Sequence, residues 1–253
     1  MPVDILLTIL ATSVVQSIFG VGVLLFGTPL LLLLGYAFVD ALSVLLPVSI
    51  AISCLQMLKH YRHIDHVLYK NVLIYSVPLV MAFLVLVTSI KINIGLLIGF
   101  LLIFVALKSF STAIENALQS IVKYERLYLV ITGLVHGMSN LGGSLLTVMI
   151  VSKKYPKDQT RATAAACYAT FAFCQLLTLY LIGSEFIIPY ADRISLVQVG
   201  IVMFLFTEKV LYNSIDNEKY SKLFMVFLFV AGVTLILKSF KGFLRRKAVK
   251  RQQ

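Results

Sequence analysis

Repeated apolar stretches of about 20 residues constrain this chain more than any other feature of its sequence, because a helix of that length crosses a hydrocarbon core of ~30 Å. Hydrophobic residues make up 60% of the 253 residues, and charged residues make up only 13%. Soluble domains carry roughly 25% charged residues. The mean hydropathy is +0.96. The composition predicts a polytopic membrane protein in contact with lipid, and it leaves no soluble domain for binding nucleic acid.

The apolar stretches read as helices and not as the strands of a membrane barrel. Transmembrane strands alternate in polarity over about 10 residues, whereas the runs here are continuous, as in Leu30–Leu34. Backbone groups that lie in lipid must be paired within the protein, and a helix pairs them within one segment. We therefore predict an all-α fold.

We expect eight apolar segments, arranged as two sets of four. They are Ile5–Leu34, Ala41–Leu58, Val72–Ser89, Ile94–Leu107, Leu127–Val151, Ala162–Ile182, Ile194–Phe206 and Leu223–Leu237. The longest connection, Lys108–Arg126, is typical of an interfacial amphipathic segment. This division predicts a first membrane repeat at 1–110, an interfacial linker at 111–126, a second membrane repeat at 127–240 and a basic tail at 241–253.

The first and fifth segments are both rich in glycine near their middles, and a shift of 120 residues places Gly22 on Gly142 and Leu25 on Leu145. Each of these two segments is followed by three apolar segments without such an interruption. Glycine-interrupted segments at corresponding positions of two halves point to the binding site of a transporter. We predict that the first segment of each repeat is broken or re-entrant. Pro29 follows the first break and costs little there if it lies in the first turn of a new helix.

The distribution of Lys and Arg leaves two topologies open. If every segment crosses once, the loops carry seven basic residues on one side and eight on the other, without the tail. If segments one and five return to the side they enter, thirteen share one face and only Lys91 and Arg193 oppose them. The second arrangement fits the positive-inside rule and inverts the halves relative to each other. It also places the basic tail on the side poor in positive charge.

The two interrupted segments carry the candidate binding site for a small anion. A broken helix exposes N–H groups at the start of its second half, and these groups attract anions. The alternative is that the small residues serve only close helix packing. The candidate substrate-binding residues are Gly20, Gly22, Gly27 and Thr28 in the first segment, and His136, Ser139, Asn140, Gly142, Gly143 and Ser144 in the second.

Enzymatic and metal-binding roles have weaker support in the sequence. Ser139 and His136 could form a hydrolase pair, but Leu141 occupies the final glycine position of the G-x-S-x-G elbow. His60, His63 and His66 recur every three residues, and on a helix the outer two drift off one face. We expect no enzyme activity, no metal and no cofactor.

Several motifs together resemble the sulfite exporter TauE/SafE family. The stretches that carry the resemblance are Ser17–Gly22, Gly27–Gly35, Val39–Ser43, Arg62–Asp65, Gly137–Ser144 and Arg161–Ala164. The second repeat departs from the first by having Met149 in place of Pro29. The resemblance covers nearly the whole chain and implies a secondary transporter with two four-segment repeats, for sulfite, organosulfonates or related small anions.

We therefore predict a multi-pass transporter of the cell (inner) membrane that moves a small anion by alternating access. The alternative is a channel-like or accessory membrane protein that uses its small residues only for assembly. The expected partners are the anionic substrate and membrane lipid, and assembly as a homodimer is left open.

Overall fold

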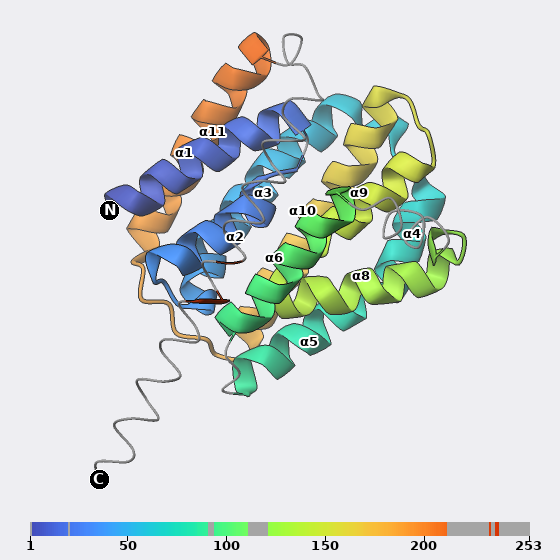
Figure 1. Ribbon diagram of the computed structural model, residues 1–253. Coiled ribbons are helices and arrows are strands. Elements are labelled where there is room, and N and C mark those ends of the chain that lie inside the picture. Colours follow the sequence, from blue (N-terminus) through green and yellow to red (C-terminus); the bar gives the residue numbers. More distant parts are fainter. Residues whose placement is uncertain are drawn as a thin grey trace.

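The structure is a computed structural model that describes residues 2–19, 21–90, 94–110 and 121–211, together with 233, 236 and 237. All regular elements of these residues are helical, and they form one bundle (Figure 1). Four stretches are long and apolar enough to cross a membrane: Phe38–Leu58, His66–Ser89, Asp158–Leu181 and Tyr190–Val210. The prediction of an all-α polytopic membrane protein is confirmed at this level.

The first apolar segment folds as a helical hairpin. Helix α1 (Val3–Phe19) is followed by α2 (Val23–Leu34), which packs against it. The hydroxyl of Tyr36, just after α2, donates to the carboxylate of Asp4, at the start of α1, over 2.9 Å. Since the outer ends of the two helices meet there, the chain reverses its direction between α1 and α2. We call α1 and α2 the first hairpin.

Pro29 does not lie in the first turn after the break, so the condition under which proline costs little is not met. Helix α2 already begins at Val23 and runs through Pro29 to Leu34. Proline lacks an N–H group and normally disturbs a helix interior. In a helix this short, the missing hydrogen bond falls in the second turn, and the chain continues to a left-handed cap at Gly35.

The fifth apolar segment folds as a second hairpin. Helix α8 (Glu125–Ser139) and helix α9 (Gly143–Ser152) meet at a tip formed by residues 140–142. At the open end, Lys153 Nζ lies 2.5 Å from the carboxylate of Glu125. Both interrupted segments thus return toward the end at which they begin.

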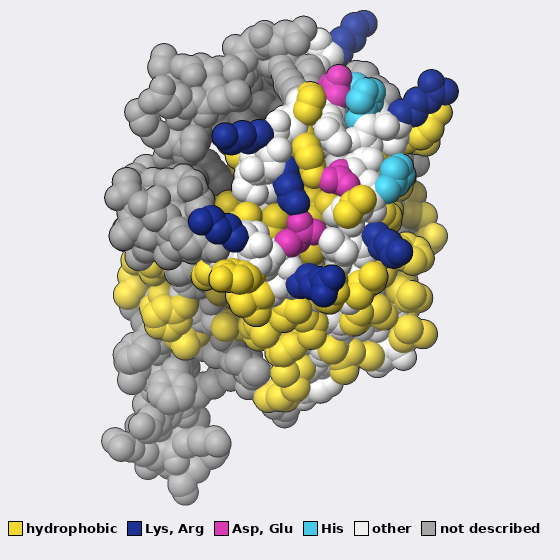
Figure 2. Space-filling model, turned by 90° about the vertical axis from the view of Figure 1, so that its right-hand side faces the viewer, with side chains coloured by type: hydrophobic (Ala, Val, Ile, Leu, Met, Phe, Trp, Pro, Cys, Tyr) yellow, Lys and Arg dark blue, Asp and Glu magenta, His cyan; other side chains and the backbone are white. Residues whose placement is uncertain are grey.

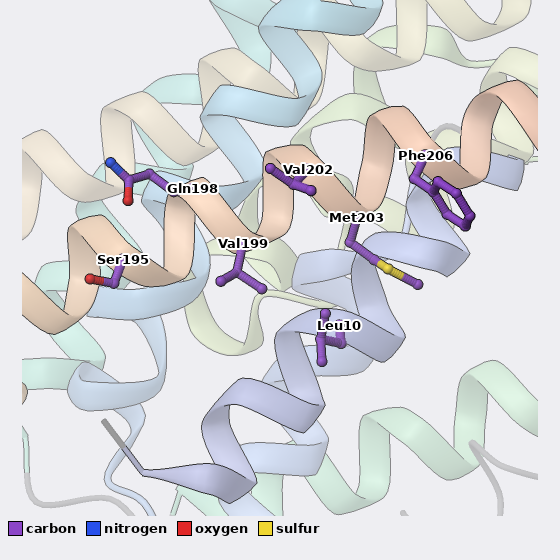
Figure 3. A pocket seen from close by; sticks show the side chains of 7 residues that line it. All are labelled: Leu10, Ser195, Gln198, Val199, Val202, Met203 and Phe206. Atoms are coloured by element: carbon purple, nitrogen blue, oxygen red, sulfur yellow. The ribbon is translucent and has the colours of Figure 1, made fainter.

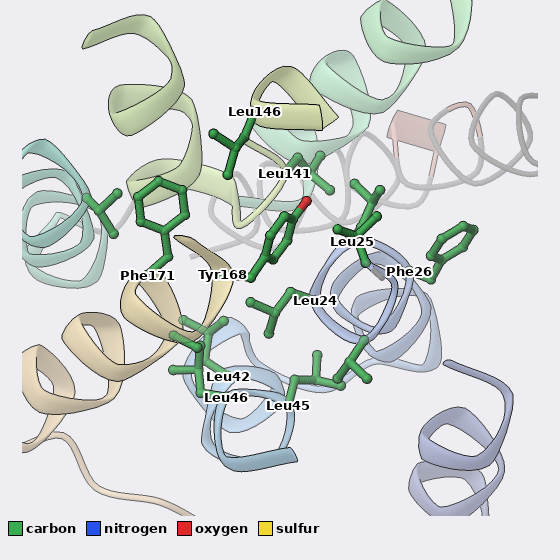
Figure 4. Close-up of a cluster of buried hydrophobic side chains, with 14 of the residues drawn as sticks. Leu24, Leu25, Phe26, Leu42, Leu45, Leu46, Leu141, Leu146, Tyr168 and Phe171 are labelled. Carbon is green, nitrogen blue, oxygen red and sulfur yellow. The ribbon is translucent and has the colours of Figure 1, made fainter. Parts of the chain in front are cut away.

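The remaining helices surround the two hairpins. They are α3 (Phe38–His60), the 3-10 turn η1 (Tyr61–His63), α4 (His66–Tyr75), α5 (Val77–Ser89), α6 (Ile94–Phe110), α10 (Lys157–Leu181) and α11 (Tyr190–Leu211). The most extensive packing joins α3 to α10, while α1 packs on α11 and α8 packs on α5. Between the hairpins and these helices lies a core of leucine, phenylalanine and tyrosine side chains (Figure 4).

Small residues permit the closest helix contacts. A Cβ atom on Gly133 of α8 would lie 2.5 Å from the carbonyl oxygen of Ser76, between α4 and α5, and one on Gly137 would lie 2.7 Å from the carbonyl oxygen of Val80. In lipid, helices associate through such close packing because apolar burial does not favour protein over lipid. The predicted packing role of small residues is therefore present in α8.

The predicted segments agree with the helices in number and order as far as the structure describes them. The third segment begins earlier than predicted, because α4 starts at His66 with Asp65 as its N-cap. The final segment, Leu223–Leu237, lies mainly outside the described residues, as do Gly20 and most of the interfacial linker.

Polar loops gather at both ends of α3, which is roughly 33 Å long at 1.5 Å per residue. At its C-terminal end, the backbone N–H of Asp65 donates to Thr163 of α10 over 3.0 Å. Lys153 pairs there with Glu125. Figure 2 shows Lys, Arg, His and acidic side chains together on one face, above a belt of hydrophobic side chains. At the other end, Asp40 accepts from the backbone N–H of Ile187 over 3.1 Å.

Candidate functional site

The tip of the second hairpin contacts the first hairpin through Asn140. This residue adopts a left-handed conformation with φ 64°, which asparagine tolerates better than most residues. Its backbone N–H donates to the carbonyl of His136 over 2.8 Å and ends α8. Its side-chain amide donates to Thr28 Oγ1 over 2.9 Å, and both side chains are buried. The two predicted halves of the site therefore meet.

Gln16 organises the tip of the first hairpin. Its side-chain oxygen Oε1 accepts a hydrogen bond from the backbone N–H of Val23, the first residue of α2, over 3.0 Å. Its amide donates to Ser53 of α3 over 3.2 Å, and Gln56 of α3 donates to the Gln16 backbone carbonyl over 3.1 Å. One of the N–H groups that a helix start leaves without an intrahelical partner is thereby satisfied. Gln16 is not among the residues that the sequence predicted for the site.

His136 lies one turn before the tip of the second hairpin and is completely buried. Its ring lies 4.7 Å from that of Phe171 and 6.5 Å from that of Tyr168, measured between centroids. The side-chain amide of Gln175 approaches the ring, but neither ring nitrogen has a described hydrogen-bond partner of normal geometry. Buried polar groups are normally paired, so His136 provides hydrogen-bonding capacity that the described protein does not use.

The four described glycines of the candidate site all lie where a side chain would collide with a neighbour. An added Cβ on Gly22 would lie 2.7 Å from the backbone nitrogen of Gln16, and one on Gly142 would lie 2.5 Å from the carbonyl oxygen of Thr132. These two positions allow the hairpins to turn tightly. A Cβ atom on Gly27 would lie 2.4 Å from a methyl carbon of Leu45. One on Gly143 would lie 1.8 Å from the hydroxyl oxygen of Tyr168.

The two serines of the candidate site make hydrogen bonds within the turn itself. Ser139 Oγ donates to the carbonyl of Val135 over 2.6 Å and accepts from the N–H of Leu141 over 3.2 Å. Ser144 Oγ donates to the carbonyl of Leu141 over 2.9 Å. Both hydroxyls therefore stabilise the tip in this conformation. Ser139 is directed to its own helix backbone rather than to His136.

A largely buried ion pair lies beside the tip of the first hairpin, and its members are not among the predicted site residues. Arg161 of α10 lies 2.7 Å from the carboxylate of Glu208 of α11, and their side chains are only 5% and 12% exposed. The guanidinium also donates to the carbonyl of Ser17 over 3.2 Å, and Thr207 donates to the Ser17 hydroxyl over 2.8 Å. Each charged residue lies near the end of its apolar segment, where sequence alone suggests a solvated loop charge.

A polar network joins the open end of the second hairpin to the loop after α3. The hydroxyl of Tyr155 donates to the carboxylate of Asp65, whose other oxygen caps α4 by accepting from Val67 and Leu68. Burial acts to raise the pKa of Asp65, but these hydrogen bonds and nearby Lys153 outweigh it and hold the pKa below its ordinary value. Asp65 therefore stays ionised at neutral pH.

The histidines near this network do not form a metal centre in the part of the chain that is described. The rings of His60 and His63 are 6.1 Å apart, and His60 Nδ1 lies 3.9 Å from Asp158. No group of three His, Cys, Asp or Glu side chains with metal-binding geometry is found among the described residues.

A groove of about 420 Å³ lies between α1 and α11 (Figure 3). Leu10, Val199, Val202, Met203 and Phe206 form most of its wall, with Ser195 and Gln198 toward one end. An anion needs hydrogen-bond donors or positive charge to replace its water. This mainly apolar groove therefore fits an anion poorly, and the polar hairpin tips fit one better.

The family model for the sulfite exporter TauE/SafE family matches residues 5–235. The match spans both hairpins and all the described helices around them. The chain belongs to the sulfite exporter TauE/SafE family.

Membership in the TauE/SafE family confirms the resemblance found in the sequence motifs. No curated protein and no solved structure shows a significant match to the chain. Because TauE/SafE proteins are membrane transporters, membership favours a role in transport over the hydrolase alternative for Ser139 and His136.

Proposed function

We propose that this TauE/SafE protein is a secondary transporter that moves a small anion across the cell membrane by alternating access. The substrate class is sulfite, an organosulfonate or a related small organic anion. The observation that carries the proposal is the hydrogen bond from Asn140 to Thr28, which brings the tips of the two interrupted segments together inside the bundle.

The chemistry of the tips suits an anion. Helices α2 and α9 both begin at a tip, and the start of a helix carries partial positive charge and N–H groups without intrahelical acceptors. Around them lie the buried polar groups of His136, Asn140 and Thr28. We infer that the substrate binds between the tips and that the predicted glycines let the chain approach it closely.

A division into two related repeats has support from the helix positions. Helices α2 and α3 start at residues 23 and 38, and α9 and α10 start at residues 143 and 157, close to a shift of 120. The packing partners also correspond, since α1 packs on α11 while α8 packs on α5. We infer that each half contributes its hairpin to a shared centre and packs the first helix of that hairpin on the third apolar segment of the other half.

The re-entrant topology has support from the contacts between loops. Single crossings would place the loop after α3 and the loop after α9 on opposite sides of the membrane. Tyr155, after α9, instead donates to Asp65, after α3, and Lys153 pairs with Glu125 at the start of α8. We infer that these loops face the cytoplasm, where positive charge accumulates. The first hairpin then opens to the other side, which inverts the two halves.

Inverted hairpins that meet near the centre provide a route to alternating access. In transporters with inverted repeats, the substrate site lies where the repeats meet, and one half rocks against the other. We infer that the hairpins loosen alternately from the α3–α10 pair and expose the site to one side at a time. The channel-like alternative predicts instead a flux that does not saturate.

Anion binding measured by thermal shift in detergent tests the proposal. Sulfite, sulfoacetate and acetate are titrated against the wild type and Asn140→Ala. We expect at least one of these anions to raise the thermal midpoint of the wild type and the shift to shrink in the variant. Midpoints that no anion changes, or equal shifts in the two proteins, would remove the support for this site.

A further inference from the structure

Tyr168 of α10 carries a buried hydroxyl that no described group meets in normal hydrogen-bond geometry. The residue is only 2% exposed, and although the side chain of Thr147 on α9 approaches the hydroxyl, no described acceptor or donor meets it in normal hydrogen-bond geometry. Tyr128 of α8 is equally buried, yet its hydroxyl donates to the carbonyl of Leu145 over 2.9 Å. Because burial without a partner is costly for a hydroxyl, the contrast suggests that Tyr168 has a partner outside the described protein.

The hydroxyl of Tyr168 lies at the N-terminus of α9. It packs against Gly143, the first residue of that helix, so closely that a Cβ atom there would be 1.8 Å from the oxygen. Figure 4 shows the ring close to Leu24 of the first hairpin, with its hydroxyl pointing toward Leu141 and Leu25. The hydroxyl is thus at the junction of the two hairpin tips.

His136 provides a second unpaired polar side chain at the same place. Its ring faces Tyr168 edge-on, with centroids 6.5 Å apart, and it is completely buried. Gly142 packs on its Cβ, so the imidazole lies directly behind the tip. The N-terminus of α9 is thus flanked by two buried polar side chains, Tyr168 and His136, that lack partners of normal geometry. This arrangement is more specific for an anion site than a helix N-terminus alone.

We propose that Tyr168 is a substrate-binding residue whose hydroxyl donates a hydrogen bond to an oxygen of the transported oxyanion at the N-terminus of α9. This inference rests on the proposed function. Sulfite and sulfonate groups carry three oxygens, so one oxygen can accept from Tyr168 while another accepts from the α9 backbone. A hydrogen bond to a charged acceptor is stronger than one between neutral groups, and the buried location excludes competing water.

Replacing each buried tyrosine by phenylalanine separates substrate binding from structure. Tyr168→Phe removes the unpaired hydroxyl and keeps the ring, while Tyr128→Phe removes a hydroxyl that is paired within the protein. The dissociation constant for sulfite is measured by calorimetric titration of the full chain in detergent, and the thermal midpoint is measured without anion. We expect Tyr168→Phe to bind sulfite about tenfold to a hundredfold more weakly with an unchanged midpoint. Tyr128→Phe should lower the midpoint and bind within about twofold of the wild type.

The possible results separate this inference from the proposed function. If the wild type binds sulfite and Tyr168→Phe binds it equally well, the inference is overturned while the proposed function stands. If Tyr168→Phe fails to fold or melts much earlier, its hydroxyl has a structural role, which also overturns the inference. If sulfite, sulfoacetate and acetate all fail to bind the wild type, the proposed function fails and the inference fails with it.

Discussion

Asn140 at the tip of the second hairpin donates a 2.9 Å hydrogen bond to Thr28 of α2, which lies 112 residues earlier in the chain. Both residues are buried at the centre of the bundle. This bond directly links the two interrupted segments, so a movement of one hairpin relative to the other must stretch or break it. Asn140 and Thr28 therefore belong both to the candidate site and to the contact that holds this conformation.

The Asn140–Thr28 bond should be measurable as a coupling energy. Thr28→Val keeps the side-chain size but leaves the Asn140 amide without its acceptor, which should cost about 1–3 kcal/mol. Combining it with Asn140→Ala should cost less than the sum of the single changes, because each removes the same bond. Chemical denaturation in detergent measures all three variants.

Thr12→Val is the matched control for this cycle. The Thr12 hydroxyl donates to the carbonyl of Thr8 in its own helix over 2.7 Å. Loss of such a local bond has little effect on a helix, so Thr12→Val should stay within about 0.5 kcal/mol of the wild type. Additive effects of Thr28→Val and Asn140→Ala would contradict the assigned coupling.

Disruption of the buried pair between Arg161 and Glu208 should be strongly destabilising. Removal of one member takes away the opposite charge beside the other, and breaking a largely buried pair in this way typically costs about 3–5 kcal/mol. We expect Arg161→Met or Glu208→Leu to lower the thermal midpoint markedly, and the double variant to recover part of the loss. The exposed Arg62→Met serves as the control and should change stability by less than about 1 kcal/mol. A small effect of Arg161→Met would refute a structural role of the pair.

Close backbone packing at Gly133 should make this position more sensitive than Gly200. A methyl group on Gly133 meets the backbone of Ser76 at 2.5 Å, whereas one on Gly200 meets the side chain of Val48 at 2.7 Å. A side chain can rotate away and a packed helix backbone cannot, so Gly133→Ala should cost about 1–3 kcal/mol and Gly200→Ala less. Thermal midpoints in detergent compare them, and equal midpoints would argue against the tight contact of α8 with α4 and α5.

The charge of Asp65 should stabilise the protein at neutral pH and lose this effect in acid. Its pKa in the folded protein lies below the ordinary value of 3.8, so its contribution is fully present above that value. It disappears as the pH falls through the lower, folded-state pKa. The midpoint difference between wild type and Asp65→Asn should thus be constant from about pH 8 to pH 5 and shrink below about pH 4. A difference that grows as the pH falls would mean that the pKa of Asp65 is raised instead.

Local features of the sequence predicted most of the helices and the two interruptions. Continuous apolar runs require helices in lipid, and paired glycines mark where the hairpins turn. The place of Pro29 within α2 does not follow from the sequence, because proline generally breaks a helix, yet α2 continues through it. A neighbouring helix can compensate for such a break, and single-residue rules do not include that contribution.

Contacts between distant segments account for what the sequence could not predict. The pairs Asn140–Thr28 and Arg161–Glu208 depend on how the helices pack, which no spacing along the chain records. Tyr168 lies in a part of α10 that is rich in small residues (162–172), and the large polar side chain among them is the hint that the sequence offers. Gln16, by contrast, can be identified from the sequence, because the shift of 120 residues between the two halves places it on His136.

Counterflow of labelled sulfite in proteoliposomes tests the central claim most directly. Vesicles that contain purified protein are loaded with unlabelled sulfite and diluted into labelled sulfite, with Asn140→Ala and empty vesicles as controls. We expect transient accumulation of label that saturates with external sulfite, is blocked by excess unlabelled sulfite and falls strongly in Asn140→Ala. Uptake equal to that of empty vesicles for sulfite and for organosulfonates, by a protein that remains folded, would contradict it.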